Sequence, residues 1–189
     1  ADQLAAWFRR AHGPTDLIVR EHRPVPLRYH YFEHGKLSPL LKKLGRSHER
    51  PRLRPEMGRH VRSWEVQVDP EEVVALLAEQ EMLPAIYFVF SRRGCEAAMQ
   101  RCAHLELLTK EEVVRLEQIV APYLAENAAV RYHPHLRYLP RGVAAHHAGL
   151  LPAWKVLVER LFHAGLIKAV FATETLAAGI NMPARTTVI

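Results

Sequence analysis

The sequence of 189 residues lacks the long apolar segments that form membrane-spanning helices. Its apolar runs are all much shorter than the roughly 20 residues that a helix needs to cross a bilayer. No segment combines a basic start with an apolar core and a small-residue cleavage site. The sequence opens on Ala1 rather than Met and stops on the apolar pair Val188-Ile189, so we expect both ends to lie inside a longer protein.

Cysteine is scarce, with only Cys95 and Cys102 in the sequence. On one helix this spacing separates the two backbones by about 10 Å, which is too far for a disulfide. We therefore expect both thiols to be reduced and packed in a core. A chain of this kind suits a cytoplasmic protein.

Two glycine-rich phosphate-binding patterns are also absent. No G-x-x-x-x-G-K-[ST] loop occurs, so nothing in this sequence predicts a cradle for the β- and γ-phosphates of a nucleotide, and we expect no catalytic residues in this part of the protein. The G-x-G-x-x-G pattern is absent too. Its absence counts against the alternative of a Rossmann-like binding module or a small-molecule α/β enzyme.

The net charge of +6 is unevenly distributed. Residues 1–63 carry 14 Lys and Arg against 6 Asp and Glu, whereas residues 64–189 carry 12 against 14. A basic first part can meet phosphates, although basic surface is also common in soluble proteins. Residues 45–63 are rich in Arg and Pro and predict an exposed loop, either a solvated face or an RNA contact.

Apolar periodicity predicts strands alternating with helices from residue 69 onwards. The predicted strands are Ala85–Phe90, Val143–Ala145, Ala169–Phe171 and Thr186–Ile189. Helices are predicted to begin at Asp69-Pro70, at Ser91, at Thr109 with Glu112 as a capping box, and at Pro152, the last ending at Gly165. This alternation predicts an α/β fold with a parallel sheet flanked by helices.

Three predicted helices carry apolar stripes that should form the core. The stripes are Cys95, Ala98, Met99 and Cys102; then Val113, Leu116, Val120 and Leu124; then Trp154, Leu157, Val158, Leu161 and Phe162. We interpret the Trp154 stripe as core packing rather than a stacking platform.

The first 26 residues have a different pattern. Asp2–His12 predicts a helix with Leu4, Trp7 and Phe8 on its apolar side, and Leu17-Ile18-Val19 predicts a short strand. Arg23-Pro24-Val25-Pro26 then predicts a linker, because neither proline can donate to a ladder or continue a helix.

The carboxyl ends of three predicted strands are followed by polar or glycine-bearing turns. These turns are Ser91-Arg92-Arg93, His146-His147-Ala148-Gly149, and Thr173-Glu174-Thr175 with Ala178-Gly179-Ile180-Asn181. Ligands of open parallel sheets bind at this edge, and helix N-termini there attract phosphates. The pattern predicts a phosphate-rich ligand.

Two strings carry a specific resemblance. GVAAHHAGLLP and FATETLAAGINMPARTTVI together resemble the HHxGL element and motif V of superkiller-type DExH-box helicases, the exosome-associated RNA helicases of superfamily two and their bacterial relatives. PAIYFVFSRRGCE is similar to motif IV, and RPVPLRYHYF resembles the linker and first strand of the second RecA-like lobe. The resemblance implies that residues 1–26 end the first lobe and link it to a second lobe at 27–189.

The resemblance also implies roles for individual residues. Nucleic-acid backbone contacts are implied for Ser91, Arg92, His147, Gly149, Thr173, Glu174 and Thr175, and coupling to the ATP side for Gly179 and Asn181. Arg93 fits either a backbone contact or a solvated charge.

The whole protein would need ATP and Mg²⁺, with no cofactor held tightly by this fragment. Single-stranded RNA, the first lobe of the same chain and a ribonuclease complex are the implied partners. A DNA-repair helicase and a non-catalytic nucleic-acid-binding module stay open as alternatives. In the absence of the rest of the first lobe, we expect Leu4, Trp7, Phe8 and Ile18 to be exposed, and the elements that carry them to be disordered or paired in a dimer.

The twelve histidines raise the possibility of a metal site. His146 and His147 are adjacent, so in an extended chain they point to opposite sides. His133 and His135 are better spaced but have no Cys or acidic partner nearby in sequence. We therefore expect no metal site.

Overall fold

The structure is a computed structural model, and it describes residues 2–18, 26–33, 35–40, 68–173 and 182–189. The predicted linker residues Arg23, Pro24 and Val25, the loop at 45–63 and Val19 lie outside these ranges.

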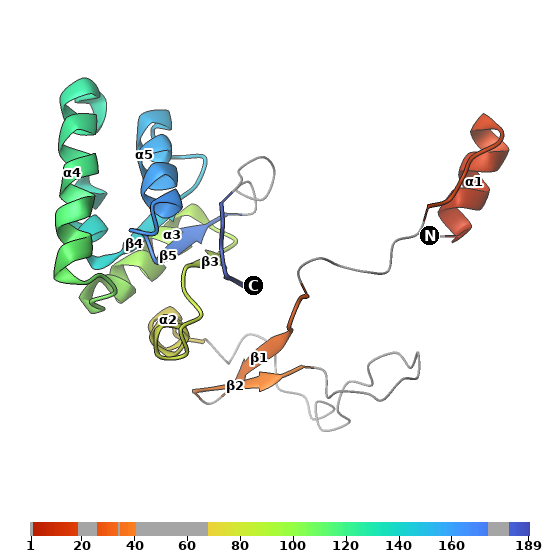
Figure 1. The fold of residues 1–189 in the computed structure, drawn as a ribbon, viewed down its shortest axis with the longest axis horizontal. Helices are drawn as coiled ribbons and strands as arrows, with labels where there is room; N and C mark the ends of the chain where they lie inside the picture. The colour runs from red at the N-terminus through yellow and green to blue at the C-terminus, as the bar shows by residue number, and fades with distance from the viewer. Residues whose placement is uncertain (1, 19–25, 34, 41–67, 174–181) are drawn as a thin grey trace. The chain divides into compact units, whose positions relative to one another are not determined.

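A four-stranded parallel sheet lies at the centre of residues 68–189 (Figure 1). Its strands are β3 (Ala85–Phe88), β4 (Val143–His146), β5 (Ala169–Ala172) and β6 (Thr186–Val188), in the order β4-β5-β3-β6. Every pair is parallel. The predicted α/β fold is confirmed, and a parallel sheet flanked by helices is consistent with a RecA-like lobe.

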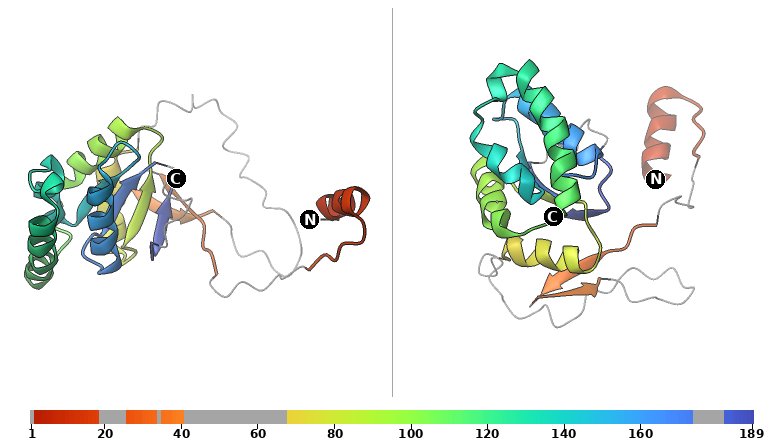
Figure 2. Two further views of the ribbon diagram at one scale, coloured as in Figure 1. Left: turned by 90° about the horizontal axis from the view of Figure 1, so that it is seen from above. Right: turned by 60° about the vertical axis from the view of Figure 1, so that its left-hand side comes forward.

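In the described part of residues 68–189, four helices and three 3₁₀ segments accompany these strands (Figure 2). They are α2 (Pro70–Glu79), α3 (Arg92–Arg101), α4 (Lys110–Glu126), α5 (Pro152–His163), η2 (Cys102–His104), η3 (Ala128–Val130) and η4 (Pro134–Arg141). The predicted caps are confirmed: Asp69 and Ser91 each accept a backbone N–H, and Thr109 with Glu112 forms the capping box.

The core forms where α3 and α5 meet the sheet. All predicted stripe residues of α5, from Trp154 to Phe162, are buried, and so are those of α3 together with Cys102. Burial raises the pKa of Cys102 to about 12 and that of Cys95 to about 11, so both free thiols are protonated at neutral pH. Of the α4 stripe only Leu116 is fully buried; Val120 and Leu124 pack at the margin of the core, and Val113 is half-buried.

The prediction for the end of the first strand is wrong. β3 ends at Phe88. Phe90, which we expected to lie in a strand buried on both faces, is 82% exposed. The chain keeps one more sheet hydrogen bond, from Val89 N to Ala172 O at 2.8 Å, and then turns away to begin α3. The cap at Ser91 requires this turn, because a helix must leave the plane of the sheet.

The predicted helix near the start is confirmed as α1 (Asp2–His12), with Leu4, Trp7 and Phe8 exposed as expected. The predicted strand after it is wrong for its described residues, because Leu17 and Ile18 form no strand. A strand needs a neighbour to take its hydrogen bonds, and neither residue pairs with one in the described parts of the chain. Further on, β1 (His30–Glu33) and β2 (Lys36–Pro39) form a two-stranded sheet.

Candidate nucleic-acid interface

The register of the sheet brings three strand ends level with one another. Phe88 of β3 and His146 of β4 both lie opposite Ala172 of β5. The turns that follow these strands therefore start at one edge of the sheet, the edge at which ligands of open parallel sheets bind.

The turn after β3 is held by the helix cap. Ser91 Oγ accepts a hydrogen bond from Gly94 N at 3.0 Å, so one of its acceptor positions is used by the cap. Ser91, Arg92 and Arg93 are exposed at the first turn of α3. Unpaired backbone N–H groups and guanidinium side chains at a helix N-terminus are suited to phosphate.

The turn after β4 is held by His147. Its Nδ1 accepts a hydrogen bond from Gly149 N at 3.2 Å, and its Nε2 lies 3.3 Å from Glu96 Oε1 on α3. The side chain is buried and only 3% of the residue is exposed. His147 thus shapes the turn from inside, whereas Gly149 is at the surface.

Gly149 and Arg92 meet across these two turns. A Cβ atom at Gly149 would lie 3.2 Å from Arg92 Cδ and 3.2 Å from His147 Nδ1. Glycine is therefore the residue that lets the Arg92 stem pass close to the backbone of the β4 turn. The structure brings Arg92, His147 and Gly149 together, as the strand-end pattern predicts.

Thr173 follows β5 directly and is half-buried. Its place at the end of β5 puts it at the same edge of the sheet as the other two turns. Glu174, Thr175, Gly179 and Asn181 lie outside the described residues, so their roles stay predictions.

Comparison with known proteins shows which proteins the chain is similar to. No protein-family model matches the chain. Over its whole length the chain is 39% identical to a protein of Mycobacterium tuberculosis named "Probable helicase HelY" and 37% identical to the Arabidopsis thaliana "DExH-box ATP-dependent RNA helicase DExH15 chloroplastic". Over 61% of its length it is 42% identical to the human "Exosome RNA helicase MTR4".

The chain belongs to the superkiller-type DExH-box helicases. It spans 24%, 20% and 12% of the lengths of these three relatives, in the same order. It is thus similar to one segment of much longer proteins. None of the described helices is both long and apolar enough to cross a membrane.

A second pair of a histidine and a glutamate lies at the same end of β4 in this helicase fragment. His146 Nε2 lies 2.9 Å from Glu159 Oε1 of α5, so the two adjacent histidines reach different helices. Burial lowers the pKa of His146 and outweighs the hydrogen bond that His146 donates to Glu159, which acts to raise it. Burial, and not the pair with Glu159, therefore favours the neutral form of His146.

The rings of His133 and His135 both pack against Trp154. The His133 ring stacks on the indole with ring centroids 4.0 Å apart and an interplanar angle of 13°. Burial, assisted by the nearby charge of His135, lowers the pKa of His133 to about 4. Within the described ranges no group of three or more His, Cys, Asp or Glu side chains is placed to hold a metal ion.

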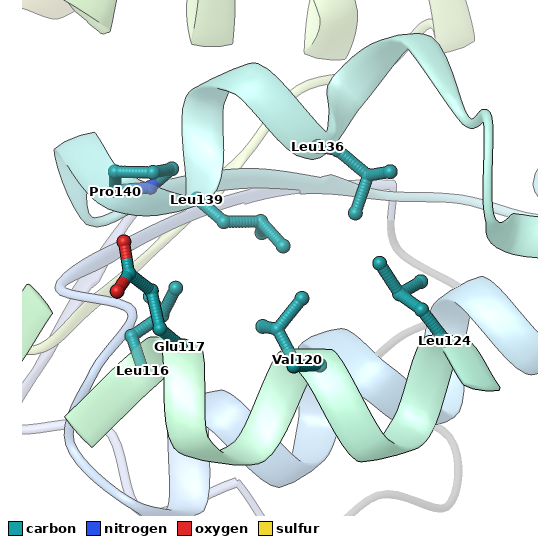
Figure 3. A pocket seen from close by; sticks show the side chains of 8 residues that line it. Leu116, Glu117, Val120, Leu124, Leu136, Leu139 and Pro140 are labelled. Carbon is teal, nitrogen blue, oxygen red and sulfur yellow. The ribbon is translucent and has the colours of Figure 1, made fainter. Parts of the chain in front are cut away.

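An apolar cavity of about 240 Å³ lies between α4 and η4 (Figure 3). Its lining is formed by Leu116, Glu117, Val120, Ala121, Leu124, Leu136, Leu139 and Pro140. This lining has no residue in common with the three strand-end turns, and it offers no guanidinium or hydroxyl group to a phosphate.

Reasoning from the sequence missed two residues that shape the interface. Because Gly94 has no side chain, Ser91 and Val89 can lie close to its backbone. A Cβ atom at Gly94 would lie 2.7 Å from Ser91 Oγ. Glu96 holds His147 although 51 residues separate them. The position of Glu96 on α3, one turn beyond the Ser91 cap, is the only signal in the sequence that could have pointed to it.

Proposed function

We propose that this chain is part of an ATP-dependent RNA helicase that translocates on RNA and unwinds it. In this proposal residues 1–26 end the first RecA-like lobe and link it to the second, and residues 27–189 form most of the second lobe. The fragment supplies contacts to the nucleic-acid backbone and no complete ATPase site.

The observation that supports this most is the convergence of Arg92 and Gly149 at the carboxyl edge of the sheet. Both are exposed, and they come from turns that are far apart in the sequence. A guanidinium group beside an open glycine backbone suits a sugar–phosphate chain, which brings negative charge but no sequence information. Family membership makes RNA the first candidate ligand.

We further propose that ATP and Mg²⁺ are bound by other parts of the whole protein. The described residues offer no cluster of carboxylates for Mg²⁺, and the sequence has no phosphate loop. The first lobe of the same protein is then an obligatory partner, and the fragment alone hydrolyses no ATP. A ribonuclease complex is a further candidate partner, since one relative is named an exosome helicase.

Measuring RNA affinity as a function of salt tests the proposal. The chain should bind single-stranded RNA, and the affinity should fall steeply as salt rises because phosphate contacts release counterions. Thr173→Ala should weaken binding by up to about tenfold and equally for all RNA sequences. Thr187→Ala, on exposed Thr187 of β6, is the matched control and should bind like the wild type.

Three results would decide against the proposal or parts of it. A Thr173→Ala variant with altered sequence preference and unchanged affinity would remove the phosphate role of Thr173. Equal affinity for RNA and DNA of the same sequence would show that the 2′-hydroxyl is not read and would favour the DNA-repair alternative. Binding that is insensitive to salt would contradict both nucleic-acid readings.

A further inference from the structure

The side chain that links the two exposed turns is Glu96. It lies on α3, the helix whose first turn carries Ser91 and Arg92, and its carboxylate reaches His147 at the end of β4. No other described contact between acidic and histidine side chains joins these two elements. This pair is therefore a polar link between the β4 turn and α3, in addition to the apolar packing between the two elements.

The hydrogen bonds around His147 determine where its ring proton is. Gly149 N can only donate, so His147 Nδ1 must be the unprotonated acceptor. In the neutral ring the proton is then on Nε2, which donates to Glu96 Oε1. A proton on Nδ1 would face the Gly149 N–H and break the turn.

Burial makes this arrangement sensitive to the loss of either partner. The His147 side chain is 4% exposed and the Glu96 side chain 39%, so the carboxylate meets solvent while the ring does not. Without Glu96, the Nε2–H would lose its acceptor within the protein, and only solvent entering the space left by the Glu96 side chain could replace it. The ring could then rotate or change tautomer, and the Gly149 backbone would lose its anchor.

We propose that Glu96 is a positioning residue of the nucleic-acid interface: through His147 it holds the Gly149 backbone against Arg92 so that both meet consecutive phosphates. Glu96 itself contacts no ligand. The inference rests on the proposed function, because it assigns Glu96 to the same RNA-binding edge.

Three variants test this role, with Glu159 as an internal comparison. Glu96→Ala removes the acceptor, Glu96→Gln keeps an amide oxygen that can accept from His147, and Glu159→Ala removes the equivalent carboxylate from His146. Affinity is measured by fluorescence anisotropy with a labelled oligouridine. The tautomer of His147 is read from the NMR shifts of its ring nitrogens, and thermal unfolding is followed by circular dichroism.

Glu96→Ala should bind the oligouridine about tenfold more weakly, whereas Glu96→Gln should stay within about twofold of the wild type. Glu159→Ala should lower the unfolding temperature without changing the affinity. In the wild type His147 should be protonated on Nε2, and Glu96→Ala should abolish that preference. A purely structural role of Glu96 would lower stability in both alanine variants and change binding in neither.

The inference is overturned if Glu96→Ala folds and binds like the wild type, or if wild-type His147 is protonated on Nδ1. A wild-type chain with no salt-sensitive affinity for oligouridine overturns the proposed function instead. In that event the tautomer measurement still decides whether Glu96 orients His147.

Discussion

Gly94 is the residue at which the strand-end edge is packed most tightly. A Cβ there would lie 2.7 Å from both Ser91 Oγ and Val89 Cγ1, which is closer than real Cβ atoms come to other heavy atoms. Gly94→Ala should therefore displace the cap and lower the free energy of unfolding by about 1–3 kcal/mol. Ser91→Ala, which removes the cap without adding an atom, should lose only about 1 kcal/mol.

Urea unfolding of the two variants measures this difference. If Gly94→Ala were as stable as the wild type, the close approach of Gly94 to Ser91 would not exist in solution.

His133 should make the stability of the chain depend on pH. Its folded pKa is lowered to about 4, first by burial and then by the charge of His135, while the unfolded value is about 6.5. Between these values the unfolded chain binds a proton that the folded chain does not, so stability falls as the pH falls through this window and levels off below it. His135 and His146, whose pKa values are also lowered by burial, add to the same trend.

Urea midpoints between about pH 7 and pH 5 test this, because carboxylates are still ionised there. His133→Phe keeps a ring stacked on Trp154 but cannot be protonated, so its stability should depend less on pH. An identical slope for wild type and variant would mean that His133 does not contribute.

Reasoning from the sequence could predict which residues gather at the edge but not how they touch. Parallel strands have their carboxyl ends at one edge of the sheet, and this rule predicted that Arg92, His147 and Gly149 lie close together. The rule depends only on parallel topology. It could not reveal that His147 is buried with both ring nitrogens engaged, since this depends on a carboxylate 51 residues away.

The start of α4 shows how one side chain can hold a helix and a strand together. Glu112 Oε2 accepts a hydrogen bond from Thr109 N at 3.0 Å. Glu112 Oε1 accepts one at 2.6 Å from Nζ of Lys168, the residue that precedes β5. Burial acts to raise the pKa of Glu112, but the hydrogen bonds from Lys168 and Thr109 outweigh it, and the pKa is lowered. Losing both contacts in Glu112→Ala should cost about 2 kcal/mol.

Gln118→Ala is the control for Glu112→Ala, because Gln118 is exposed on the same helix and alanine favours helix there. Thermal unfolding should separate the two variants clearly. Equal unfolding temperatures would show that the capping box and the Lys168 pair contribute nothing measurable.

At the scale of elements, local signals and tertiary pairing had different predictive value. The caps at Asp69, Ser91 and Thr109 were predicted correctly because they need only residues a few positions apart. The end of β3 was not predicted correctly, since Phe90 is apolar yet exposed. Strand pairing is a property of neighbours in space, and Leu17 with Ile18 lacks such neighbours in the described chain.

At the scale of the whole molecule, α1 carries an apolar surface that the described residues leave uncovered. Leu4 is 61% exposed, Trp7 53% and Phe8 39%, and they are spaced three and four residues apart on one side of the helix. Under the proposed function, in which residues 1–26 end the first lobe, this stripe would pack in that lobe. In the isolated chain we expect it to pair with α1 of a second molecule, which would bury the same surface twice.

Sedimentation velocity over a range of concentrations tests this last expectation. The wild-type chain should associate as concentration rises, and Trp7→Glu should stay monomeric because a carboxylate cannot be buried in an apolar contact without a partner. Ala6→Glu adds the same charge on the opposite, exposed side of α1 and should associate like the wild type. If all three chains sediment as monomers, the stripe has no partner in a second copy. Protection of the α1 amides from hydrogen exchange in such monomers would further show that the helix is stable without a partner.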